Sequence, residues 1–246
     1  MDYWWLGIAQ LMEKIIPNLP NLESLSLRLS HVLPPRLSHV LSQLAYLHTL
    51  RVQLKDVALG PHLSFVKNLR HLELDLAPPP PDTEHSSPVV ESSFKNMIGL
   101  IDNSAQTLET LILHSHDPIC TAGFVHYMAP GQSLQTSLKA CKGMSSFGVY
   151  MEVHDTESAL MAVNSLIGLP VTILHLKCKP HMFPETPSEG YGLGIDVLKR
   201  VCQVHPMIED LKLEDGEVGK RNLARPADGH VFVSYSGSST LTLPHH

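Results

Sequence analysis

The chain has 246 residues, 43% of them hydrophobic and 17% charged, a balance typical of a folded protein and not of a disordered one. Its formal net charge is −6, from 18 basic and 24 acidic residues, and it contains no run of lysine and arginine. Because phosphate binding relies on clustered positive charge, these values argue against nucleic acid as a partner.

A leucine phrase recurs along the chain: an apolar residue, two others, leucine, two others, leucine, one other, then leucine or valine. It spans residues 19–27, 44–52 and 66–74, and weaker versions follow. Repetition at this period predicts a solenoid, in which each unit buries its apolar face against its neighbours. We count about eight irregular repeats in a single domain over residues 1–246. The last apolar residue of each phrase serves as a register mark, and the marks are Leu27, Val52, Leu74, Leu113, Val149, Leu176, Leu213 and Leu243.

The apolar spacing predicts strands inside the phrases and helices between them. Leu25, Leu27 and Leu29 alternate with other residues, which places them on one face of a short strand. Between phrases the spacing changes to three and four residues, the pattern of an amphipathic helix, and Asp155 stands where an N-cap is expected. The helices are expected near residues 3–16, 35–44, 94–101, 132–142, 155–168 and 192–204.

Alternation of strand and helix calls for parallel strands joined by helical crossovers. Loop insertions are expected near residues 77–93, 179–191 and 214–230, which are rich in proline or polar residues. The four-proline run that starts at Pro78 favours an extended conformation, and it reads either as a surface spacer or as a ligand for an SH3-type domain.

The N-terminal helix carries Trp4 and Trp5 beside its apolar stripe. As the open end of a repeat stack it exposes apolar surface, so it is a candidate surface for self-association. Glu13 and Lys14 interrupt the apolar segment well short of a membrane span, and no basic leader precedes it. We therefore expect no membrane partner and no signal peptide.

Four cysteines, at positions 120, 141, 178 and 202, lie too far apart for a Cys-x-x-Cys metal or redox motif, and no Asn-x-Ser/Thr site occurs. Together with the lack of a signal peptide, this predicts free thiols and an intracellular protein of the cytoplasm or nucleus.

The phrase Leu19-Pro20-Asn21-Leu22-Glu23-Ser24-Leu25 resembles the leucine-rich repeats of the ribonuclease-inhibitor-like group, and best the degenerate repeats of F-box/leucine-rich-repeat proteins, which form large fungal families. The resemblance covers residues 19–213. It implies an α/β leucine-rich-repeat solenoid, a horseshoe with parallel strands on the concave face and helices on the convex face. In that family the repeats hold a substrate protein, and an F-box docks on the adaptor of a cullin–RING ubiquitin ligase.

No F-box is found, since only 18 residues precede the first phrase. Three interpretations stay open: a fragment, a truncated gene model, or a stand-alone repeat protein. The function expected is a non-enzymatic protein-binding scaffold, by resemblance the substrate-recognition part of an F-box-type ligase receptor. The alternative is a stand-alone regulatory or structural interaction protein.

The residues between the inward leucines are expected to face the concave groove. Their mixed charges suit a protein or peptide partner better than a polyanion. The central column is expected to contain Ser26, Arg51, Glu73, Ile112, Gly148, His175 and Lys212. The predicted protein-binding residues are Arg28, Arg51, Glu73, Asp75, His114, Tyr150, His175, Lys177 and Lys212.

No nucleophile elbow or P-loop occurs, so we expect no enzyme, cofactor or metal. The glycines at 190, 192 and 194 follow a proline-rich loop and indicate the start of a helix, not a dinucleotide fingerprint. A less favoured alternative is a metal-dependent enzyme that uses His114 and His116, the densest histidine cluster. Zinc normally takes three or four ligands, and spacing identifies no third one.

Overall fold

The computed structural model describes residues 3–29, 35–54, 59, 63, 66–76, 86–116, 118–179, 193–215, 219–224, 232–235 and 240–242. The chain forms two compact units. The first contains Met1–Leu113 and Gly131–Ser145, and the second contains His114–Pro130 and Ser146–His246. Both have the α/β composition expected from the sequence.

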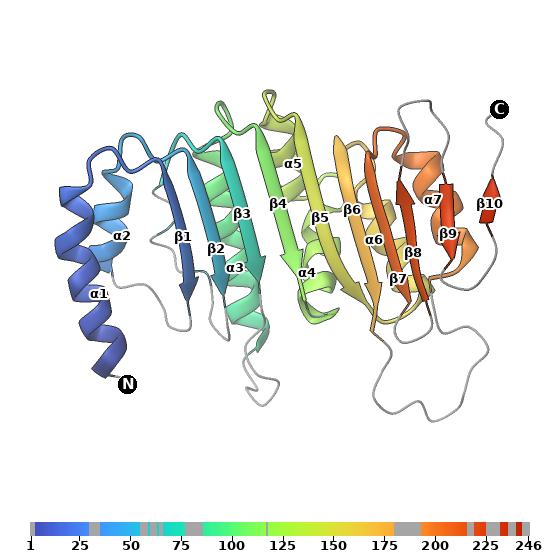
Figure 1. Cartoon of the computed structure of the whole chain (residues 1–246), viewed down its shortest axis with the longest axis horizontal. Helices are drawn as coiled ribbons and strands as arrows, with labels where there is room; N and C mark the ends of the chain where they lie inside the picture. Colours follow the sequence, from blue (N-terminus) through green and yellow to red (C-terminus); the bar gives the residue numbers. More distant parts are fainter. Residues whose placement is uncertain are drawn as a thin grey trace. The chain divides into compact units, whose positions relative to one another are not determined.

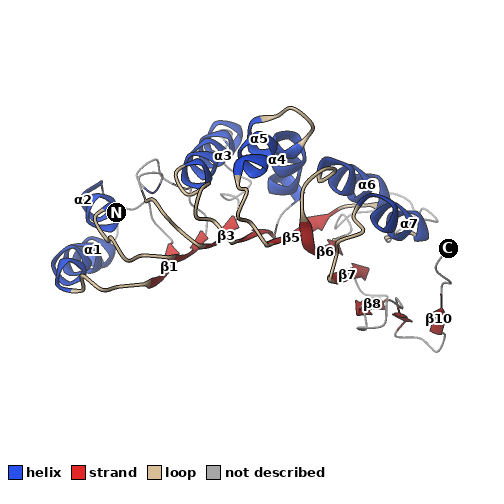
Figure 2. Ribbon diagram, turned by 90° about the horizontal axis from the view of Figure 1, so that it is seen from above, coloured by secondary structure: helices blue, strands red, loops and turns tan. Residues whose placement is uncertain are grey.

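In the first unit, parallel strands in chain order are covered on one face by helices (Figures 1 and 2). Strands β1, β2 and β3 pair in register, so that Leu27, Val52 and Leu74 lie side by side. The strands are β1 (Ser24–Leu29), β2 (Thr49–Leu54), β3 (His71–Leu76) and β4 (Thr110–Ser115), whose last two residues belong to the second unit. The helical segments are α1 (Tyr3–Ile15), η1 (Ile16–Asn18), α2 (Pro35–Ser42), α3 (Ser86–Asp102) and α5 (Ser133–Ala140).

A shared backbone carbonyl fixes the start of each strand after β1 in this unit. The carbonyl oxygen of Glu23 accepts hydrogen bonds from the N–H groups of His48 and Thr49, at 2.9 and 3.0 Å. The carbonyl oxygens of His48 and Arg70 accept in the same way from residues 70–71 and 109–110. Each carbonyl oxygen precedes the first N–H group that it binds by 25, 22 or 39 residues (23 to 48, 48 to 70 and 70 to 109). The first four register marks are separated by the same intervals.

The second unit begins with the parallel strands β5 (Ser146–Val153), β6 (Val171–Cys178) and β7 (Asp210–Asp215). Helices α4 (Pro118–Met128), α6 (Thr156–Ser165) and α7 (Ile195–Val204) cover one face of these strands (Figure 2). The sheet continues with β8 (Gly219–Ala224), β9 (Phe232–Tyr235) and β10 (Thr240–Thr242), which pair antiparallel. The sequence predicts an eighth repeat with a parallel strand at Leu241, and this is wrong, because Leu241 lies in the antiparallel strand β10. Its register mark, Leu243, lies outside the described residues.

The leucines of the phrases form the core between strands and helices. The alternation predicted for the strands is confirmed: in β2, for example, Leu50, Val52 and Leu54 are buried while Arg51 and Gln53 are exposed. Burying one such side chain contributes about 1.5–3 kcal/mol. Every register mark in the described part of the chain is buried, namely Leu27, Val52, Leu74, Leu113, Val149, Leu176 and Leu213.

The six predicted helices are present, and Asp155 caps α6 as expected, because its Oδ1 accepts a hydrogen bond of 2.7 Å from the Ser158 N–H. The pKa of Asp155 is lowered by hydrogen bonds from the backbone and hydroxyl of Ser158. Helix α4 was not predicted. Its apolar residues do not form a leucine stripe, although Phe124 and Met128 are fully buried.

Two of the predicted loops are partly wrong. Residues 86–93 begin α3, because Pro88 stands in the first turn, where its missing N–H costs no helical hydrogen bond. Residues 219–224 form β8, which pairs along the backbone of β7. The Asp215-Gly216 dipeptide is a known sequence signal of hairpins and could have indicated this pair. Apart from Lys179, the loop expected over 179–191 lies outside the described residues.

In the described residues, no helix has the length and apolar character needed to cross a bilayer.

Candidate functional site

The strands of each unit have one face opposite the helices, which we call the open face. In the first unit it carries two rows of side chains across β1–β3: Ser26, Arg51 and Glu73, then Arg28, Gln53 and Asp75. The expected neighbours Arg51 and Glu73 form an ion pair of 3.0 Å between Nε and Oε2. Gln53, which sequence reasoning did not select, donates a 2.9 Å hydrogen bond from Nε2 to Oδ2 of Asp75. Arg28 lies exposed on the outer strand β1 of this unit.

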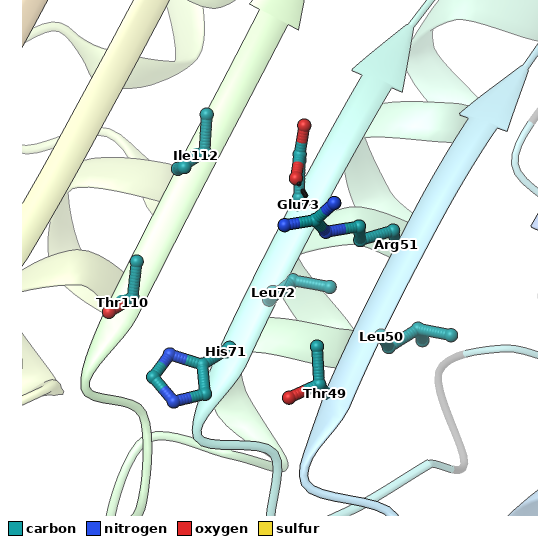
Figure 3. Close-up of a pocket in the computed structure, with 8 residues that line it drawn as sticks. All are labelled: Thr49, Leu50, Arg51, His71, Leu72, Glu73, Thr110 and Ile112. Carbon is teal, nitrogen blue, oxygen red and sulfur yellow. Dashed lines mark ion pairs between the residues drawn. The ribbon is translucent and has the colours of Figure 1, made fainter. Parts of the chain in front are cut away.

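A hollow of about 270 Å³ opens on this face of the first unit (Figure 3). Figure 3 shows the Arg51 guanidinium over β3 beside Glu73, with His71 and Thr110 bordering the same space. The side chains of Arg51 and Glu73 are 64% and 31% exposed, so their pair contributes only about 0–1 kcal/mol and leaves both charges accessible. The hollow is lined by Thr49, Leu50, Arg51, His71, Leu72, Glu73, Thr110 and Ile112.

In the second unit, three of the predicted residues form a row of contacting rings on the open face. The ring of Tyr150 stacks on that of His114 with 4.4 Å between centroids, and meets the ring of His175 edge-on at 4.4 Å. His175 Nε2 lies 2.9 Å from Oδ2 of Asp210. The next residue of the row is Lys212, which pairs across the strands with His175. Sequence reasoning chose these residue types but did not predict that their rings touch.

Glu152 was missed by sequence reasoning. It lies two residues after Tyr150 in β5, on the same face, and is 8% exposed. Its carboxylate pairs with Lys177 at 3.5 Å and with Lys179 at 3.1 Å. The predicted residue Lys177 is therefore engaged with an acid, as is Lys212, which pairs with Glu214 at 2.7 Å. The alternation that selected Tyr150 also points to Glu152, and was the available signal.

The predicted central column is wrong at Gly148. Tyr150, not Gly148, pairs with His175, and Gly148 pairs with Ile173. The β6 register mark Leu176 pairs with Met151, two residues beyond the β5 mark Val149, so the predicted column is displaced by two residues. A bulge also interrupts this strand pair: Phe147 pairs with Val171, so Thr172 is an extra residue on β6. The Thr172 hydroxyl accepts a hydrogen bond of 3.2 Å from the Phe147 N–H, which replaces the interrupted ladder bond. Spacing counted from the phrases has no means to reveal such an extra residue.

A second hollow, of about 310 Å³, lies at the carboxyl end of β5, between α4 and α6. Its lining is mostly apolar. It was not predicted, because α4 was not predicted. The residues that line it are Thr121, Ala122, Val125, His126, Glu152, Val153, His154, Ser158 and Met161.

The metal alternative rests on His114 and His116, whose ring centroids are 5.9 Å apart. Within the described ranges, no group of three or more histidine, cysteine, aspartate and glutamate side chains is arranged to hold an ion. His114 is instead in contact with Tyr150, as part of the ring row. His116 is exposed.

The described cysteines are free thiols, of which Cys141 and Cys178 are buried and Cys202 is exposed. Burial raises the pKa of Cys141 to about 11, with a further contribution from the charge of Asp102. Its Sγ donates to the carbonyl oxygen of Ser137 at 3.3 Å, and Sγ of Cys178 donates to that of His154 at 3.2 Å. Since the thiolate is the reactive form, Cys141 is unsuited to act as a nucleophile at neutral pH.

No family model, curated protein or solved structure matches the chain. Functional inference therefore depends on the open faces themselves. Their features are the ring row in the second unit and the hollow beside Arg51 and Glu73 in the first.

Proposed function

We propose that this protein is a non-enzymatic scaffold of the leucine-rich-repeat type that binds a protein or peptide segment on its open face. The observation that supports the proposal is the row of contacting rings of His114, Tyr150 and His175. Tyrosine is among the residues that most often dominate binding energy at protein interfaces, because a rigid ring buries much area at little entropic cost.

The surroundings of the ring row favour a protein partner over a polyanion. Lys177, Lys179 and Lys212 are each paired with a carboxylate on the same face. The lysine charges are thus largely neutralised, whereas a phosphate-binding surface needs uncompensated positive charge. An aromatic centre with a charged, self-paired rim is the composition expected of a protein interface.

The resemblance of the repeat phrases to F-box/leucine-rich-repeat proteins supports a more specific form of the proposal, in which the bound protein is a substrate for ubiquitin ligation. Mapping the 5′ end of the native transcript tests this form. An in-frame F-box would connect the scaffold to a ligase, whereas a transcript that starts at Met1 would favour a stand-alone interaction protein.

Selection of binders from a displayed library of natural peptide fragments tests the scaffold itself. Tyr150→Ala is expected to weaken the selected peptides by about 2 kcal/mol, or roughly 30-fold, measured by fluorescence anisotropy. Tyr46→Ala is the matched control, because Tyr46 is 55% exposed but precedes β2 in a turn. A selection without binders, or binders that Tyr150→Ala leaves unchanged, would contradict the proposal.

A further inference from the structure

We infer that the hollow of the first unit, on the open face over β2–β4, binds a carboxylate carried by an acidic side chain of the bound segment. This inference rests on the proposed function, since it names the chemistry of one residue of the partner. It concerns a different unit from the ring row, and it is therefore tested separately.

The main element of this carboxylate site is the guanidinium of Arg51. Its Nε pairs with Glu73 at 3.0 Å, which uses one of its five N–H donors. Across the residues that the structure describes, its terminal nitrogens make no further hydrogen bond or ion pair. The remaining N–H groups of a guanidinium have the planar geometry that a carboxylate matches with two parallel hydrogen bonds.

Three further polar groups border the same space. The hydroxyls of Thr49 and Thr110 and the ring of His71 take part in no side-chain hydrogen bond with the described residues. Each can donate a hydrogen bond to an oxygen atom placed in the hollow. Ile112 is half-buried and supplies an apolar wall for the methylene groups of an incoming side chain.

The balance of charge selects a carboxylate over other groups. The acid in the hollow, Glu73, already pairs with Arg51, so the lining offers more donors than acceptors, and an anion fits better than a cation. The charges of Arg51 and Glu73 cancel, so their ion pair adds no net charge to the lining. A singly charged carboxylate therefore suits it better than a phosphate of nearly two charges, which Glu73 would repel.

The position of the hollow favours an internal side chain of the partner over its terminal carboxylate. The lining comes from three adjacent strands, β2, β3 and β4, and β1 continues the open face beyond β2. A segment that crosses these strands continues past the hollow over β1, so an internal side chain fits this position better than a chain end.

Titration of the isotopically labelled full chain with the blocked peptide acetyl-Ala-Glu-Ala-amide tests the inference. We expect saturable NMR shifts at the Arg51 Nε–H and at the ring of His71, with dissociation in the millimolar range. Acetyl-Ala-Gln-Ala-amide, which lacks the charge, should bind about tenfold more weakly. Two further peptides should both bind more weakly than the glutamate peptide. One has phosphoserine in place of the glutamate, and the other lacks the glutamate but ends in a free terminal carboxylate.

Variants locate the site. Arg51→Gln should abolish the shifts at His71, and Thr110→Val should weaken the glutamate peptide several-fold. Arg36→Gln is the matched control, an exposed arginine of α2 that does not line the hollow, and it should change nothing. Unchanged circular dichroism establishes that each variant is folded.

Equal binding of the glutamate and glutamine peptides would overturn the inference. Tighter binding of the phosphoserine peptide would also overturn it, as would an equal loss in Arg36→Gln. Library binders that depend on Tyr150, found for a protein that does not prefer the glutamate peptide over the glutamine peptide, would overturn it and leave the proposed function standing. A glutamate peptide that binds here in a protein yielding no library binders would support the site and contradict the wider function.

Discussion

At the scale of single residues, His205 connects two helices of the second unit. It ends α7, is 4% exposed, and its Nε2 lies 3.0 Å from the carbonyl oxygen of Val163 in α6. Burial lowers the pKa of His205 below its ordinary value of 6.5, and the charge of Arg200 lowers it further, while the hydrogen bond to Val163 opposes the shift. The ring is therefore kept neutral in the folded protein.

This burial makes stability depend on pH. Below pH 6.5 the unfolded chain protonates this histidine while the folded protein does not, so the unfolded state binds more protons. The free energy of unfolding should therefore be maximal above this pH and fall as the pH drops through it toward the lower pKa of the folded state. Urea unfolding at pH 7.5 and 5.5 should show a smaller difference for His205→Gln than for the wild type.

The exposed His126→Gln serves as the control for this experiment and should keep the wild-type difference. A His205→Gln variant with the full wild-type dependence on pH would contradict the assignment.

Residue-scale features were predictable from sequence where they depend on local spacing. The burial of Leu27, Val52 and Leu74 follows from alternation, and the Asp155 cap from its position before a helix. The ring contacts of Tyr150 were not predictable, because they join strands whose alignment depends on the bulge at Thr172.

At the scale of elements, strands and amphipathic helices were predictable because each has its own apolar period. Helix α4 was missed because its apolar residues form no leucine stripe, and β8 because its pairing with β7 leaves no repeat phrase in the sequence. The first miss affects the candidate sites, since α4 forms one wall of the apolar hollow.

The bulge between β5 and β6 gives a prediction at this scale. Thr172→Val removes the hydroxyl that accepts from the N–H of the buried Phe147 and should destabilise the protein by about 1–2 kcal/mol, because a buried donor is left without a partner. Amide exchange at Phe147 should become faster. Thr172→Ser retains the acceptor and should stay near the wild type in both measurements. A larger loss in Thr172→Ser than in Thr172→Val would show that the methyl group, not the hydroxyl, stabilises the bulge.

At the scale of the whole molecule, the repeat phrase predicted one continuous stack, and the contacts group the chain into two units. The phrase carries no information about this grouping, because it describes each repeat and its core face in the same way. The assignment of the strands and helices to a leucine-rich-repeat protein stays a prediction from sequence.

The predicted self-association of the N-terminal end is testable from exposed side chains. Leu11 and Ile15 lie one turn apart on α1 and are 56% and 46% exposed, and Leu19 follows at 44%. Sedimentation equilibrium should show the average mass of the wild type rising with concentration, and the Leu11→Gln/Ile15→Gln variant should stay monomeric. Met207→Gln, which removes a residue 67% exposed in the second unit, should behave as the wild type. A wild type that stays monomeric at high concentration would contradict the prediction.

Because shared carbonyls fix where the strands start, an insertion between two strands and an insertion within a strand have different consequences in this chain. The number of residues from a shared carbonyl to the first N–H group that it binds varies from 22 to 39 (48 to 70 and 70 to 109), while the hydrogen-bond pattern stays the same. Residues added between two strands therefore leave the exposed side chains where they were, whereas one residue added within a strand turns every later side chain to the opposite face. For protein engineering, the segments between the strands can be exchanged, and the exposed side chains of the strands can be redesigned for binding independently of those segments.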